Sequence, residues 1–469
     1  MGNTLEKKRF KLPHIYVLLF CIITCVTILT WIVPAGSFDY VVDEVTGNTV
    51  AVPDSYHVIE SNPVGLFKMF QLIYSGYSDA ASIIFFVFIS YASVGIVIAS
   101  GCFNGLVATL LKVFKGKFRV AIIPIFMLII GLCSSTVGLF EEWYPFIPVF
   151  AGISIAMGFD AIVGMAIVCV GAAVGYSGAM FNPFTVGIAQ GIAEVPLYSG
   201  VGFRFASHMA MLAVAATMIC RYALKVQADP TKSVLYGETL NLDLNKDVDV
   251  ANAPFGIREK SILAILIASI VIMVYGCKVY GWYFQQLSAV FLMMGIVCGL
   301  IQGWGPNTIA TKLSVSYGNV ARACMTIGLS RGILLILKSS NLIDTVVYYV
   351  SKPLSSFPEW LSGISMLIMQ TLLNCFIPSG SGQAATIMPI MTPIADMLNV
   401  TRDTAVLAFQ FGDGVSNILW PTAAVATICA LGGIKIEKWW KFFIPIFGGI
   451  FAAQVVMMVI AVMTGFGAV

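Results

Sequence analysis

The feature that most constrains this chain is a series of apolar runs, most of them about as long as a lipid bilayer is thick. A helix of about 20 apolar residues crosses the hydrocarbon core of a membrane, and the apolar part of a cleaved signal peptide is shorter. The runs lie near 14–35, 79–101, 160–194, 202–224, 258–278, 285–303, 321–341, 403–429 and 440–465. They predict an all-α integral membrane protein.

Composition supports the same conclusion and excludes several kinds of protein. Only 10% of the residues are charged, whereas soluble chains carry about 25%. Lipid must therefore cover much of the surface. The net charge of +3 is small and dispersed, so we expect no nucleic-acid partner. The three histidines stand at no metal-ligand spacing, so we expect neither a metal site nor a membrane-embedded enzyme.

Two apolar regions, 119–157 and 359–399, are too long for one crossing. Small and polar residues interrupt each region at its centre, at Ser134–Gly138 and at Pro378–Gln383. Backbone without helical hydrogen bonds is tolerated at membrane depth only where protein or a watery cavity receives it. We therefore interpret both regions as re-entrant helical hairpins, which enter and leave the membrane on the same side.

Two of the spans are also broken by residues that disfavour a helix. The run 160–194 contains glycines and Asn182-Pro183, and the run 403–429 contains Gly412-Asp413-Gly414. Each broken span follows a hairpin, so the two halves have the same order of elements. Paired interruptions of this kind point to two inverted-topology repeats with a substrate site near the membrane midplane.

The repeats define the predicted organisation of the chain. The first half, 1–225, holds hairpin 119–157 and broken helix 160–194. A polar linker, 226–257, separates it from the second half, 258–469, with hairpin 359–399 and broken helix 403–429. The short amphipathic segments 63–76, 102–118, 304–320 and 342–357 are expected to lie in the membrane interface.

Lysine and arginine set the expected orientation. They concentrate in the loops that a cytoplasmic N-terminus would place inside, including the 226–257 linker. The first hairpin then enters from the inside and the second from the outside. We expect a multi-pass protein of the cell (inner) membrane with its N-terminus in the cytoplasm.

Short motifs in the hairpins and breaks resemble those of a known family. The matching segments are Lys11–His14, Trp31–Gly36, Glu141-Glu142, Asn182–Gln190, Ser330–Ile333, Pro378–Ala384, Gly412–Gly414 with Asn417, and Pro421-Thr422. With these motifs the chain resembles the YfcC-type branch of the anaerobic dicarboxylate carrier (DcuC-like) family, within the ion transporter superfamily. The resemblance implies a scaffold part and a transport part that move like an elevator, often in a homodimer. It also implies exchange of basic amino acids, such as arginine for ornithine, or carriage of dicarboxylates.

The hydroxyl and amide residues of the hairpins and breaks form two candidate clusters. Exposed helix N-termini favour a carboxylate and exposed C-termini favour a cation. The predicted substrate-binding residues among them are Ser134, Ser135, Thr136, Asn182, Ser379, Ser381, Gln383 and Asn417. The predicted ion- or proton-coupling residues are Ser177, Asp413 and Ser416.

Three further charged residues belong to the predicted substrate site, because charge inside a membrane is costly and usually functional. Glu141 and Glu142 are either favourably placed in the first turn of a returning half-helix or form a cation or proton site. Arg331 forms either a structural ion pair, with Asp344 or a hairpin glutamate, or a bidentate contact with a substrate carboxylate. Asp413 either caps a helix end or couples transport to a cation or a proton.

This combination of residues favours a secondary active transporter of small carboxylate-bearing metabolites. Among these substrates it favours basic amino acids. A cation-coupled dicarboxylate or short-peptide carrier is the alternative, and a channel fits the inverted halves less well. We expect no cofactor, with Na⁺ or H⁺ as candidate coupling ions, and the lipid bilayer as the surrounding partner.

Overall fold

Helices account for almost all of the regular structure. The computed structural model describes residues 15–42, 49–52, 55–113, 116–238, 254–352 and 359–467, so the Lys11–His14 motif and residues 239–253 of the linker lie outside the described residues. By length and composition, seven described helices can cross a membrane: Ala81–Ala99, Phe118–Val137, Val201–Ala228, Ile257–Cys277, Phe284–Ile301, Pro306–Ser339 and Ile436–Thr464. The predicted all-α membrane class is confirmed.

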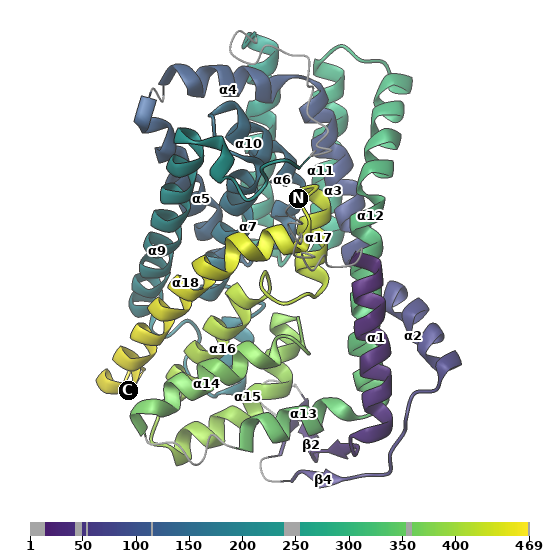
Figure 1. Cartoon of the computed structure of the whole chain (residues 1–469), viewed down its shortest axis with the longest axis vertical. Coiled ribbons are helices and arrows are strands. Elements are labelled where there is room, and N and C mark those ends of the chain that lie inside the picture. Colours follow the sequence, from purple (N-terminus) through teal and green to yellow (C-terminus); the bar gives the residue numbers. More distant parts are fainter. Residues whose placement is uncertain are drawn as a thin grey trace, which may run out of the picture.

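Four short strands follow the first helix, α1 (Ile15–Ile32), at the lower end in Figure 1. Strand β1 (Gly36–Ser37) pairs antiparallel with β4 (His57–Val58), with Gly36 opposite Val58, and β2 (Tyr40–Val42) pairs with β3 (Thr49–Ala51). Asp344 of helix α13 (Leu342–Ser351) accepts hydrogen bonds from the Phe38 amide at 3.2 Å and the Tyr40 hydroxyl at 2.8 Å. The two ribbons are thereby fixed to α13, and the sequence patterns did not predict them.

One long helix, α12 (Pro306–Ser339), organises the right-hand side of the molecule in Figure 1. Helices α1, α2 (Leu66–Asp79) and α3 (Ala81–Ala99) pack along it. Gly76 of α2 lies so close that an added Cβ would meet the Gly328 carbonyl and the Gly332 amide of α12 at 2.6 Å. The prediction of a separate interfacial segment at 304–320 is wrong, because Pro306 starts the helix that carries 321–339.

The remaining helices of this region are α4 (Cys102–Val113), α10 (Ile257–Tyr280) and α11 (Phe284–Ile301). Helix α10 ends at Gly281, whose positive φ of 63° is a backbone conformation that glycine adopts without strain. The chain then turns back, and α11 packs against both α10 and α3.

The first hairpin, here called hairpin 1, consists of η1 (Gly116–Ala121), α5 (Ile122–Val137), η2 (Glu141–Phe146) and α6 (Ile147–Ala156). Helix α5 ends at Gly138 with a φ of +78°. Both arms pack on α7 (Ala161–Ser177), whose N-terminus is capped by Asp160. After a break at 178–185 come α8 (Val186–Ile192), α9 (Val201–Ala228) and η3 (Pro230–Lys232).

The second hairpin, hairpin 2, consists of α14 (Glu359–Leu373) and α15 (Gly380–Met397). Both arms pack on α16 (Arg402–Ser416), which ends before a second break at 417–422. Pro421 lies in this break, and a proline removes a backbone donor. Helices α17 (Ala423–Leu431) and α18 (Ile436–Thr464) complete the described chain.

The two halves pack in matching ways. Helices α5 and α6 pack on α7 as α14 and α15 pack on α16, while α7 packs on α16 and α9 on α18. Figure 1 shows α9 and α18 side by side at the left. This correspondence supports the prediction of inverted repeats and re-entrant hairpins, which stay predictions.

Candidate functional site

The tip region of hairpin 1 is hydrogen-bonded to the interrupted segment of the first broken helix. We call residues 138–146 tip 1 and residues 178–185 break 1. Just before the tip, the Ser135 hydroxyl donates to the Gly178 carbonyl at 2.8 Å and accepts from the Met180 amide at 3.1 Å. These contacts satisfy backbone groups that the interrupted helix leaves without partners.

The corresponding region of the second half is a network of buried amides. We call residues 374–382 tip 2 and residues 417–422 break 2. The Asn374 side-chain amide donates to Asp413 Oδ1 at 2.9 Å, to Asn417 Oδ1 at 3.2 Å and to Gln383 Oε1 at 3.1 Å. Its own Oδ1 accepts from the Ser416 hydroxyl at 2.9 Å. Asn374 therefore joins both arms of hairpin 2 to the broken helix.

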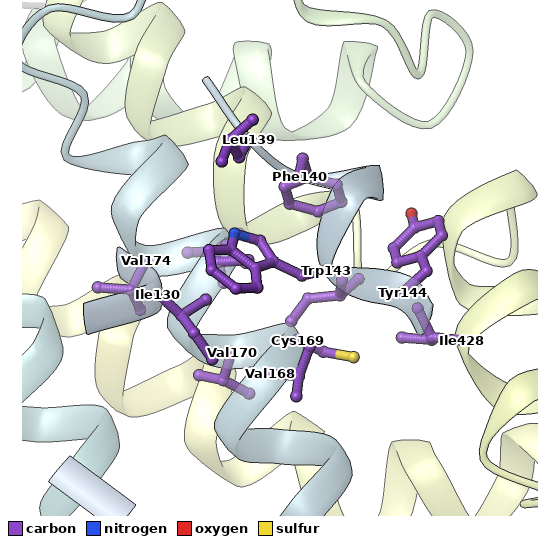
Figure 2. Close-up of a cluster of buried hydrophobic side chains, with 14 of the residues drawn as sticks. Ile130, Leu139, Phe140, Trp143, Tyr144, Val168, Cys169, Val170, Val174 and Ile428 are labelled. Carbon is purple, nitrogen blue, oxygen red and sulfur yellow. The ribbon is translucent and has the colours of Figure 1, made fainter. Parts of the chain in front are cut away.

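Each tip also meets the break of the opposite half. At tip 2, an added Cβ on Gly380 would stand 2.6 Å from Thr185 Cγ2 of break 1. At tip 1, Phe140 and Tyr144 lie with Ile418 of break 2 and Ile428 of α17 around an apolar space. Figure 2 shows these aromatic rings with Trp143 above the apolar face of α7. Two hairpin tips and two helix breaks thus converge, with a polar side at tip 2 and an apolar side at tip 1.

The helices of the two breaks cross at small residues. A Cβ on Gly414 of α16 would overlap the Ser177 backbone and hydroxyl of α7. The Ser177 hydroxyl accepts from the Val415 amide at 2.9 Å and donates to the Phe411 carbonyl at 3.3 Å. Ser177 therefore fixes the crossing of the two broken helices.

Several buried polar atoms in and beside the breaks have no hydrogen-bond partner among the described residues. They include Thr422 Oγ1 of break 2 and, on side chains that are fully buried, Asp413 Oδ2, Thr185 Oγ1 and Asn182 Nδ2. An unsatisfied buried donor or acceptor costs about 1–3 kcal/mol. Orphaned groups gathered at helix breaks mark a candidate site for a ligand, an ion or a proton.

The two glutamates of tip 1 differ in their surroundings. Glu142 is buried, and its Oε2 accepts from the Phe140 amide at 2.8 Å, so it stabilises the turn itself. Glu141 is partly exposed. Glu142 therefore has the structural role of stabilising the turn, and Glu141 is the better candidate to face a cation.

Arg331 is paired outside the two tips. Its guanidinium binds the carboxylate of Asp79 at the end of α2, and the Arg331 side chain is 31% exposed. Asp344, one predicted partner, instead accepts hydrogen bonds from the strand ribbons. Within the described chain the ion pair of Arg331 is with Asp79 and not with a hairpin glutamate. A role of Arg331 in holding a substrate carboxylate stays a prediction.

Four other predicted residues make only local contacts. Ser134 bonds to the Leu139 carbonyl of its own tip, and Thr136 bonds back to Leu132 at 2.7 Å. Ser379 caps α15 through the Gly382 amide, and Ser381 is exposed. The structure thus brings Gln383, Asp413, Ser416 and Asn417 into one cluster and joins Ser135 to break 1. The side-chain contacts described for the other four residues lie outside that cluster.

Sequence reasoning missed several residues that complete the cluster. They are Tyr176, Thr185, Gln370 and Asn374. Two of them could have been found from the sequence, because Gln370 and Asn374 place polar amides inside the apolar arm of hairpin 2.

Comparison with known proteins identifies the family. A family model described as the C4-dicarboxylate anaerobic carrier, DcuC, matches residues 12–463. The chain belongs to this carrier family. The resemblance predicted from the hairpin motifs is therefore confirmed. The protein is a multi-pass membrane transporter, and it is not an enzyme.

Two relatives match almost end to end. A protein of Escherichia coli K12, provisionally named basic amino acid antiporter YfcC, is 28% identical over 98% of both chains. An uncharacterised protein of Haemophilus influenzae is 27% identical over 98% of this chain and 99% of its own.

Two solved structures cover nearly the whole chain. One is the YdaH transporter of Alcanivorax borkumensis, with a TM-score of 0.46 and 16% identity over 97% of this chain and 99% of that one. The other is MtrF of Neisseria gonorrhoeae, with a TM-score of 0.46 and 18% identity over 96% and 95% of the two chains.

Proposed function

We propose that this carrier-family protein is a secondary active transporter of small carboxylate-bearing metabolites, with basic amino acids such as arginine and ornithine as its first candidates. The name of the Escherichia coli relative supports an amino-acid antiporter. The description of the family supports the alternative, a cation-coupled dicarboxylate or short-peptide carrier.

The observation that carries this proposal is the unpaired, buried carboxylate of Asp413. Its carboxylate is fully buried, and Oδ2 has no partner among the described residues. The ion pairs of the described chain do not include Asp413. An unpaired charge in this position is strongly unfavourable. A proton, Na⁺ or a cationic substrate group therefore supplies the missing partner, with Ser177 and Ser416 supporting the backbone around it.

The packing supports an elevator-like mechanism. The hairpins, broken helices, α9 and α18 form one interlocked unit around the α7–α16 crossing. Helices α1, α2 and α3 pack along α12 and suit a scaffold, which meets the unit where α12 contacts α17 and α3 contacts η2. In the proposed cycle the unit slides against this scaffold, and the site faces one side of the membrane at a time. We propose a homodimer in the inner membrane with a cytoplasmic N-terminus.

The three acidic residues at the tips favour a cationic cargo over a dicarboxylate. Glu141 and Glu142 belong to tip 1, and Asp413 lies beneath tip 2. A dicarboxylate would meet repulsion from these carboxylates unless a cation were bound first. A basic amino acid offers both a carboxylate for helix N-termini or Arg331 and a cation for the acidic residues.

A transport screen in proteoliposomes tests this proposal. Labelled arginine, ornithine, a neutral amino acid and succinate are offered with and without Na⁺ and proton gradients. We expect saturable uptake of arginine and ornithine well above protein-free liposomes. Uptake of succinate alone, driven by a cation gradient, would contradict the amino-acid assignment and establish the alternative.

A further inference from the structure

The place where tip 2 closes on break 1 has an unusual chemical lining. Three groups surround the position that a side chain of Gly380 would occupy: Thr185 Cγ2 at 2.6 Å, Asp413 Oδ2 at 2.9 Å and the Tyr176 hydroxyl at 3.0 Å. They come from break 1, α16 and α7. A carboxylate and two hydroxyl-bearing side chains from both halves of the chain therefore converge at one glycine.

Two of these side chains carry oxygens without hydrogen bonds. Asp413 Oδ2 and Thr185 Oγ1 are buried without partners in the described part of the chain, although Asp413 Oδ1 is fully engaged with Asn374 and Asn417. The network of amides thus fixes one oxygen of the carboxylate and leaves the other turned toward Gly380. Oxygens without donors, one of them charged, form an environment that favours a cation.

We propose that Tyr176, Thr185 and Asp413 bind one monovalent cationic group beneath tip 2. Tyr176 adds a neutral oxygen ligand to the charge of Asp413. The methyl group of Thr185 faces Gly380, and the hydroxyl of the same side chain, which is buried without a partner among the described residues, is the second neutral ligand that we propose. This inference rests on the proposed function, because it assigns that function's cation to particular atoms. The cationic group is either the ammonium or guanidinium end of the cargo or a free inorganic cation such as Na⁺.

Gly380 makes the closure of this site possible. With no side chain at position 380, the start of α15 lies directly against Thr185, Asp413 and Tyr176. Any larger residue would hold tip 2 away from these groups or fill the space of the cation. Gly382 lies two residues further in the same tip, but the atoms nearest to its added Cβ belong to Ser379 and Ile377 of its own hairpin. The two glycines form a matched pair for a test.

The ligands are tested with conservative variants of the full chain purified in detergent. Tyr176→Phe and Thr185→Val each remove one hydroxyl. Thr386→Val is the control, because its hydroxyl bonds only to the Gly382 carbonyl of its own helix at 2.9 Å. Binding of arginine and of citrulline, its neutral analogue, is measured by calorimetry in sodium and in choline buffers.

Each hydroxyl variant is expected to weaken the binding of its cation about tenfold to a hundredfold, the range for a hydrogen bond to a charged group. If only the affinity for arginine falls, the cationic end of the cargo occupies the site. Equal loss for arginine and citrulline, with a higher sodium requirement, places an inorganic cation there. Gly380→Ala should weaken the same binding, whereas Gly382→Ala and Thr386→Val should resemble the parent.

The proposal is overturned if Tyr176→Phe, Thr185→Val and Gly380→Ala all keep the parent's arginine affinity and sodium dependence. Failure of the proposed function has a different signature. The parent would then bind neither arginine nor citrulline but would bind succinate, and the sodium dependence of succinate binding in the same variants would still decide whether the cation site exists.

Discussion

Asp413→Asn is expected to abolish gradient-driven uptake while leaving the protein folded. An asparagine side chain keeps an oxygen where Asp413 Oδ1 accepts from Asn374 and Asn417. Only the unpaired Oδ2 changes, from a charged acceptor to a neutral donor. Because the change removes charge at the point that we assign to the cation, uptake should fall at least about a hundredfold.

Uptake of labelled arginine under an imposed ion gradient measures this effect. The melting temperature of the purified variant serves as the test of folding. Asp396→Asn is the matched control, since Asp396 lies in the same half but pairs with Arg402 at 2.9 Å, away from the tip network. If Asp413→Asn accumulates arginine as the parent does, Asp413 is not the coupling residue.

The second large effect is on stability and concerns a buried ion pair between the halves. Arg204 of α9 lies 3.5 Å from Asp403 at the start of α16, and both side chains are almost fully buried. The Ser199 hydroxyl and the Gln190 side chain also bind Asp403, at 2.7 and 3.1 Å. Arg204→Met would leave the carboxylate without a countercharge, at a cost of about 3–5 kcal/mol.

Thermal unfolding in detergent measures this loss as a lower melting temperature and a shorter half-life on heating. Adding Asp403→Asn to Arg204→Met should recover much of the loss, because the second change removes the stranded charge. Lys232→Met is the control, because its pair with Asp229 is exposed and such pairs contribute about 0–1 kcal/mol. Equal melting temperatures for Arg204→Met and the control would show that the buried pair contributes little.

The features that sequence alone predicted best are those fixed by local physical constraints. A run such as 202–224 must be a helix in a membrane because its backbone has no other partners there, and the structure has α9 at Val201–Ala228. The helix breaks were equally visible, since Pro183 and the glycines around Asp413 disfavour a continuous helix.

The features that it missed depend on contacts between distant parts of the chain. Arg331 and Asp79 are 252 residues apart, and no local pattern links them. The central position of Asn374 follows from tip 2 lying against α16, which requires the tertiary arrangement. The start of α12 was misplaced because polar residues at 306–320 resemble an interfacial segment until the packing of α3 along them is known.

The central claim, that two halves build one alternating-access site, is tested most directly by counterflow. Proteoliposomes loaded with millimolar unlabelled arginine are diluted into trace labelled arginine, with no ion gradient. A carrier exchanges the two, so label should accumulate transiently above its external concentration and then decline. Simple equilibration of label without this overshoot, and without saturation, would indicate a channel and contradict the account.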